Sequence, residues 1–285
     1  MNTANTLNAL INLTDEPDAN LYEIIANAII SFSDEALPLL KENLGVVHDL
    51  YHRNRIESLI YTIEYQGVVE KIRQWRNKRS YDLAEPYFIL SRHRFPNADW
   101  SNIGFRTMVM VEQAEDIISD NLTPLEKVRA LNHIIYKVNK FRGDIVSVNN
   151  PDYYFINTLF ETNVGNPLSL GLLYSIIAER LRLPIYGVDL PQHFILAYTK
   201  QTDHHPLLED VLFYINPFND GLVLTRDDIR KYLGRLKIQP RLKYFEPATN
   251  THIIEKLFNT LIDIYTINGK ENEADEMREM LELYN

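Results

Sequence analysis

The chain has 285 residues, of which 45% are apolar and 24% charged, the composition of a globular protein with one large domain or two to three smaller ones. Its formal net charge of −10 argues against nucleic acid and anionic membranes as partners. The absence of cysteine excludes disulfides, thiolate metal sites and a thiol nucleophile, and with no secretory leader or membrane span visible we expect a cytoplasmic protein.

The first 100 residues carry the pattern of stacked helices. Apolar residues recur every three or four positions in 19–47 and 54–78, and again from Tyr81 to Leu90, before the turn near Pro96. We find no group of residues in this region whose types and spacing point to a catalytic or metal-binding site. Its histidines are isolated on helices and are not expected to bind a metal; they are His48, His52 and His93.

Two helix starts are marked in the second region. Thr123-Pro124-Leu125-Glu126 is a capping box, and the helix after it is predicted to run towards Phe141. Asn166 then caps a helix that begins at Pro167. That helix is apolar in nearly every direction, which indicates a buried helix, and its Gly171 predicts a close contact with another element.

From residue 185 the apolar pattern alternates, which predicts a small antiparallel sheet. Its four short strands are expected at 185–188, 193–198, 211–215 and 222–224. Asn219-Asp220-Gly221 is a tight-turn sequence. A short helix capped by Thr225 follows. The last residues are expected to form two amphipathic helices whose apolar pattern is similar to that of a single tetratricopeptide unit.

Three polar residues lie at informative places in this pattern. Ser169 is at the start of the buried helix, His193 begins the second strand, and Asn216 ends the third. This is the order and chemistry of a Cys-His-Asp site in which serine replaces the cysteine and asparagine the aspartate. Each residue also has a structural interpretation: a helix-cap serine, a buried strand histidine and a turn asparagine.

The resemblance to a known family rests on specific motifs. They are Asn150-Pro151-Asp152-Tyr153-Tyr154, Gly165-Asn166-Pro167-Leu168-Ser169-Leu170, Arg182-Leu183-Pro184, Gly187-Val188 and Pro191-Gln192-His193-Phe194. With them the chain resembles the bacterial SirB-type branch of the transglutaminase-like superfamily, which has a tetratricopeptide-like tail. The resemblance covers about residues 70–285. It implies a papain-like fold in which a helix packs on an antiparallel sheet.

Position by position, the resemblance places Ser169 at the nucleophile, His193 at the base and Asn216 at the orienting acid. The chain departs from the family at Asn216, where aspartate is usual, and at Gln192, where glycine is common. Basic residues ahead of Gly165 are replaced by 161–164. A serine hydroxyl is far less acidic than a thiol, and an amide stabilises imidazolium less than a carboxylate does.

We therefore expect a predominantly helical α+β protein with a transglutaminase-like (papain-like) core. The predicted parts are a helical region at 1–100, the core at 101–245 and a tetratricopeptide-like hairpin at 246–285. The expected function is that of a pseudoenzyme acting in protein–protein interaction or regulation, with a protein or peptide partner and no cofactor or metal. The alternatives are a serine-dependent amidase, peptidase or acyl-transferase, and a structural scaffold with a vestigial pocket.

Overall fold

The computed structural model describes residues 3–78 and 82–284. The chain divides into two compact units, 1–74 and 75–285. The predicted boundaries at residues 100 and 245 stay a prediction. No helix within the described ranges is long and apolar enough to cross a membrane.

The first unit is helical, as its apolar spacing predicts. Its elements are α1 (Thr3–Ile11), α2 (Ala19–Ile30), the 3-10 helix η1 (Ser33–Glu35), α3 (Leu37–Val46) and α4 (Leu50–Arg76). The last two residues of α4 are counted in the second unit. The apolar spacing over 19–47 corresponds to two α-helices, because the chain is interrupted at Ser33, where φ is +50°. A left-handed residue cannot continue a right-handed helix.

In the second unit, helices precede the sheet. They are α5 (Ala84–Arg94), α6 (Trp100–Glu115), α7 (Pro124–Asn132), the π-helical turn η2 (His133–Val138), the 3-10 helices η3 (Ile145–Val148) and η4 (Pro151–Tyr154), α8 (Ile156–Thr162) and α9 (Pro167–Arg180). The capping box at Thr123 is confirmed: its side chain accepts the Glu126 N–H, and the Glu126 carboxylate accepts the Thr123 N–H. Tyr81, where the repeated apolar pattern of 81–90 begins, lies outside the described residues.

The predicted antiparallel sheet is confirmed, with strands in the order β3-β4-β5-β6. Its strands are β3 (Ile185–Leu190), β4 (His193–Thr199), β5 (Val211–Asn216) and β6 (Leu222–Leu224). A separate parallel pair, β1 (Arg142–Gly143) and β2 (Val164–Gly165), places Gly143 beside Gly165 at the start of α9. The predominantly helical α+β fold is thus observed.

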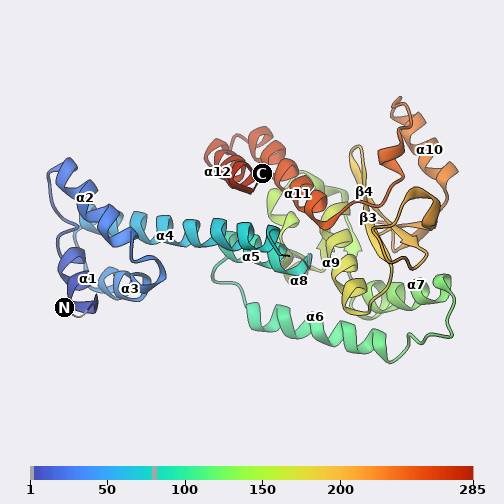
Figure 1. The fold of residues 1–285 in the computed structure, drawn as a ribbon, viewed down its shortest axis with the longest axis horizontal. Coiled ribbons are helices and arrows are strands. Elements are labelled where there is room, and N and C mark those ends of the chain that lie inside the picture. The colour runs from blue at the N-terminus through green and yellow to red at the C-terminus, as the bar shows by residue number, and fades with distance from the viewer. Residues whose placement is uncertain (1–2, 79–81, 285) are drawn as a thin grey trace. The chain divides into compact units, whose positions relative to one another are not determined.

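The two faces of β4 meet different helices because side chains alternate along a strand. Phe194 faces α9, where a Cβ on Gly171 would lie 2.4 Å from its ring, so Gly171 does permit a close approach. Ile195, on the other face, belongs to an apolar cluster with Ile229 and Leu233 of α10 (Arg226–Arg235). Figure 1 accordingly shows α10 on the far side of the sheet from α9 and α11.

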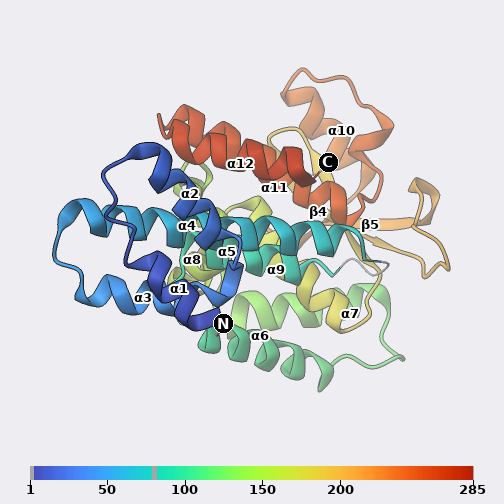
Figure 2. The ribbon, with the colours of Figure 1, turned by 60° about the vertical axis from the view of Figure 1, so that its left-hand side comes forward.

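The chain ends in a hairpin of α11 (Asn250–Ile267) and α12 (Glu271–Tyr284), which lie side by side in both views (Figures 1 and 2). The hairpin packs on the rest of its unit. Ile253 contacts Gly187 of β3, the Asn268 side chain donates to the carbonyl of Asn149 at 3.1 Å, and Glu276 pairs with His93 of α5. The buried side of α11 is therefore part of the core.

Candidate functional site

His193 and Asn216 meet on the α10 side of the sheet. Their strands are neighbours, and both residues lie on the face that also carries Ile195, so the side chain of Asn216 hydrogen-bonds the His193 ring. The Asn216 Oδ1 atom also accepts the Phe218 N–H at 3.1 Å, which holds the amide in place. The base and orienter positions of the predicted triad are thus together.

These two residues line a pocket of about 640 Å³ between the sheet and α10. Two aromatic rings flank the histidine: the centroid of Phe218 lies 6.3 Å away and that of Tyr232 5.8 Å away. The Tyr232 hydroxyl donates to the carbonyl of Pro191 at 2.9 Å, so the ring is fixed over the turn that precedes His193. The pocket is therefore apolar, with a small polar centre.

Burial lowers the pKa of His193, the hydrogen bond with Asn216 raises it, and the positive charge of Lys256 lowers it again. The net direction is downward, so the ring is neutral at neutral pH. A neutral ring can donate one hydrogen bond and accept another. Within the described residues, no group of three or more histidine, aspartate or glutamate side chains could hold a metal ion.

The third predicted residue, Ser169, is not in this pocket. It is fully buried, and its hydroxyl accepts the Asn166 N–H at 3.1 Å and donates to the Asn166 carbonyl at 3.5 Å. The Asn166 side chain in turn accepts the Ser169 N–H at 2.9 Å, which completes a capping box. The hydroxyl is thus used in the N-terminal cap of α9, and Ser169 is not among the residues that line the pocket of His193 and Asn216.

The parallel pair β1–β2 lies next to Ser169. A Cβ on Gly165 would lie 2.8 Å from the Ser169 hydroxyl, so that hydroxyl lies directly against the β2 backbone. On the neighbouring strand, a Cβ on Gly143 would lie 2.6 Å from the Phe218 ring, and Gly143 itself lines the pocket. Phe218 is thereby packed on β1, the strand that pairs with β2.

Sequence reasoning missed Gly143, Tyr232 and Arg235, which also line the pocket. Asp228, Tyr232 and Arg235 are spaced as one face of a helix, and this spacing could have been recognised in the sequence. It does not say which element that face meets. The contact of Phe218 with Gly143 joins positions 75 residues apart and leaves no local pattern.

The comparisons with known proteins agree with this fold. Residues 107–259, more than half of the chain, match the transglutaminase-like superfamily. The chain belongs to that superfamily. It is 24% identical over 212 residues to the UPF0162 protein of Xylella fastidiosa strain Temecula1, covering 70% of this chain and 72% of that protein.

Two further relatives share less of the chain. A UPF0162 protein of Buchnera aphidicola is 26% identical over 155 residues, or 53% of this chain and 54% of that protein. F-box only protein 21 of Homo sapiens is 23% identical over 155 residues, which cover 54% of this chain but only 24% of that protein. No solved structure matches the chain significantly.

Proposed function

We propose that this chain is a non-catalytic transglutaminase-like protein that binds a peptide segment of a partner protein in the pocket at His193 and Asn216. One observation supports this above all. Among the described side chains that line the pocket, none is a serine, threonine or cysteine, and the one hydroxyl, that of Tyr232, is bound to Pro191. Acyl transfer through a covalent intermediate needs a nucleophile beside the base.

What the pocket retains is suited to binding. A neutral histidine beside a fixed amide presents hydrogen-bond donors and acceptors at the base of an apolar cavity, a combination typical of ligand sites. The rim includes Leu222 of the edge strand β6, whose side chain is half exposed. An apolar side chain of a partner could be buried there while its backbone hydrogen-bonds near His193.

Two finer assignments belong to the same proposal. We place the chain in the SirB-type branch and regard the α11–α12 hairpin as a tetratricopeptide-like unit, on the motifs quoted above and on the paired geometry of the two helices. We also propose a cytoplasmic location.

The test has a chemical arm. The protein should not react with a fluorophosphonate probe at Ser169, and it should not turn over a panel of aryl esters and amides above the rate of a Ser169→Ala variant. Turnover that disappears in Ser169→Ala would overturn the proposal in favour of a serine-dependent amidase, peptidase or acyl-transferase.

The binding arm uses a phage-displayed peptide library. Peptides selected on the natural protein should lose binding to His193→Gln and to Leu222→Gln. They should still bind Val223→Gln, because Val223 is the next residue of β6, is also exposed, and does not line the pocket. Equal binding to all three variants would favour a scaffold with a vestigial pocket.

A further inference from the structure

We infer that the segment bound at this pocket is acidic, and that the exposed basic side chains of α10 and the loop after it recognise it. We call residues 226–243 the basic arm. This inference rests on the function proposed above and adds the chemistry of the partner.

The charge of the basic arm is opposite to that of the chain. It holds seven lysine and arginine residues against two aspartates, a net of +5, while the whole chain carries −10. All seven cationic side chains are exposed; they are Arg226, Arg230, Lys231, Arg235, Lys237, Arg241 and Lys243. A local field of opposite sign on an acidic protein attracts anionic partners to that place.

Most of this positive charge is not neutralised from within. Of the ion pairs between described residues, one lies in the basic arm, between Arg230 and Asp227 at 2.7 Å. The carboxylate of Asp228 accepts the N–H and the hydroxyl of Thr225 at 2.9 and 2.7 Å, so it is used in the N-terminal cap of α10. The arm therefore keeps cations available to a ligand.

The basic arm adjoins the pocket. Arg235 lines it together with Tyr232, and Lys231 lies one helical turn before Arg235. On the β1 side, Gly143 leads directly to the strongly exposed Ile145 and Val146. A ligand that places an apolar side chain in the pocket thus meets cations on its α10 side, which favours acidic residues beside that anchor.

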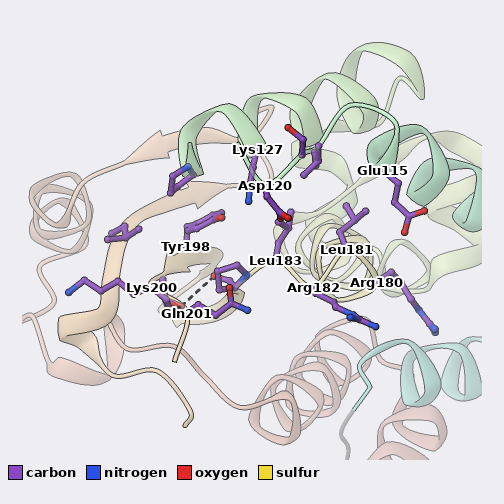
Figure 3. A pocket seen from close by; sticks show the side chains of 16 residues that line it. Glu115, Asp120, Lys127, Arg180, Leu181, Arg182, Leu183, Tyr198, Lys200 and Gln201 are labelled. Atoms are coloured by element: carbon purple, nitrogen blue, oxygen red, sulfur yellow. Dashed lines mark hydrogen bonds between the residues drawn. The ribbon is translucent and has the colours of Figure 1, made fainter. Parts of the chain in front are cut away.

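A second group of cations lacks this arrangement and serves as a control. Lys127, Arg182 and Lys200 line another pocket, of about 630 Å³, which also contains the acids Glu115 and Asp120. Figure 3 shows Lys200 at one end of that pocket and Glu115 and Arg180 at the other, with Asp120 between the two ends. This pocket includes the C-terminal end of β4, whereas His193 begins the strand.

The test measures fluorescence anisotropy with a fluorescein-labelled peptide of twelve residues that alternates glutamate and leucine. We expect it to bind at least ten times more tightly than the matched glutamine–leucine peptide, and to weaken as NaCl rises from 50 to 300 mM. The triple variant Lys231→Glu/Arg235→Glu/Lys237→Glu should lose at least tenfold in affinity. The control variant Lys127→Glu/Arg182→Glu/Lys200→Glu makes the same charge change and should bind within about twofold of the natural protein.

The outcomes separate this inference from the proposed function. If Leu222→Gln abolishes binding but the basic-arm variant does not weaken it, the pocket binds peptides and the acidic partner is wrong. Equal affinity for the two peptides, no binding of either, or tighter binding of a twelve-nucleotide single-stranded DNA would each overturn the inference. Circular dichroism of every variant verifies that a loss of binding is not a loss of fold.

Discussion

The hydroxyl of Ser169 accepts the backbone N–H of Asn166 at 3.1 Å, and the side chain of Asn166 accepts the backbone N–H of Ser169 at 2.9 Å. This reciprocal pair closes the first turn of a helix whose residues 168–178 are all buried. The residue that the family resemblance predicts at the nucleophile position is thus used to satisfy backbone groups where no water can reach them.

Ser169→Ala should therefore affect stability and leave any activity unchanged. Removing the hydroxyl leaves the buried Asn166 N–H without its acceptor, and we expect urea unfolding to show a loss of about 1–2 kcal/mol. Ser175→Ala is the matched control on the same helix. Its hydroxyl is equally buried and has no hydrogen-bond partner among the described residues, so its removal should cost less than about 0.5 kcal/mol. Equal effects at both positions would contradict this role of Ser169.

Asn216 should control the protonation of His193. Because the Asn216 side chain accepts a hydrogen bond from the ring and so raises its pKa, Asn216→Ala should lower that pKa further. Asn216→Asp should raise it above that of the natural protein, since a carboxylate favours the imidazolium. NMR titration of the His193 ring measures both shifts. An unchanged pKa in both variants would show that the two side chains do not interact in solution.

Gln192→Gly should stabilise the protein. Gln192 occupies the two-residue turn between β3 and β4 with φ of +58°, a region that costs a residue with a side chain about 1–2 kcal/mol. We expect a gain of about 1 kcal/mol in thermal or urea unfolding. Gln201→Gly, in an exposed loop without positive φ, should instead lower stability by about 0.5–1 kcal/mol, because glycine adds freedom to the unfolded chain.

Glu179 should make stability depend on pH. Burial raises its pKa to about 7, although its hydrogen bonds with the Asn250 side chain and the Leu83 N–H partly oppose this. The folded chain holds the proton more tightly than the unfolded chain. This stabilisation is complete below the usual carboxyl pKa and is lost as the pH rises through about 7.

The variant Glu179→Gln lacks this titration. It should have nearly the stability of the natural protein at pH 5, and should exceed it at pH 8 by on the order of 1–3 kcal/mol. Urea unfolding at the two pH values measures the difference. A difference that does not grow between pH 5 and pH 8 would contradict the raised pKa.

The C-terminal hairpin should contribute to the core. Leu261→Ala removes a fully buried side chain of α11 and should cost about 2–5 kcal/mol. Ile267→Ala, on the same helix but 82% exposed, should change the free energy of unfolding by less than about 0.5 kcal/mol. If both substitutions are neutral, the hairpin does not pack on the rest of its unit in solution.

The sequence predicted elements best where local chemistry decides them. The caps at Thr123, Asn166 and Thr225 are all confirmed, because a capping side chain acts on the backbone two or three residues away. The helix predicted to run towards Phe141 instead changes to a π-helical turn at His133. Helix α6 was not assigned from the sequence at all.

At the candidate site, too, the features set by local sequence could be predicted and the others could not. The meeting of His193 and Asn216 followed from two neighbouring strands with alternating side chains. The place of Ser169 could not be predicted, because a serine that closes a helix turn and a serine that attacks a substrate occupy the same position in sequence. What separates them is the neighbouring backbone of Gly165, which lies directly against the hydroxyl.

The rings of Phe218 and Tyr232 make the NMR signal of His193 sensitive to what occupies the pocket. Aromatic rings with centroids 6.3 and 5.8 Å away shift the magnetic resonance of the imidazole protons by their ring currents. Both rings line the pocket with His193, so a ligand bound there should change the surroundings of the imidazole. The chain has eight histidines, so its imidazole spectrum is sparse. The His193 signal is therefore a built-in reporter of occupancy that needs no attached label.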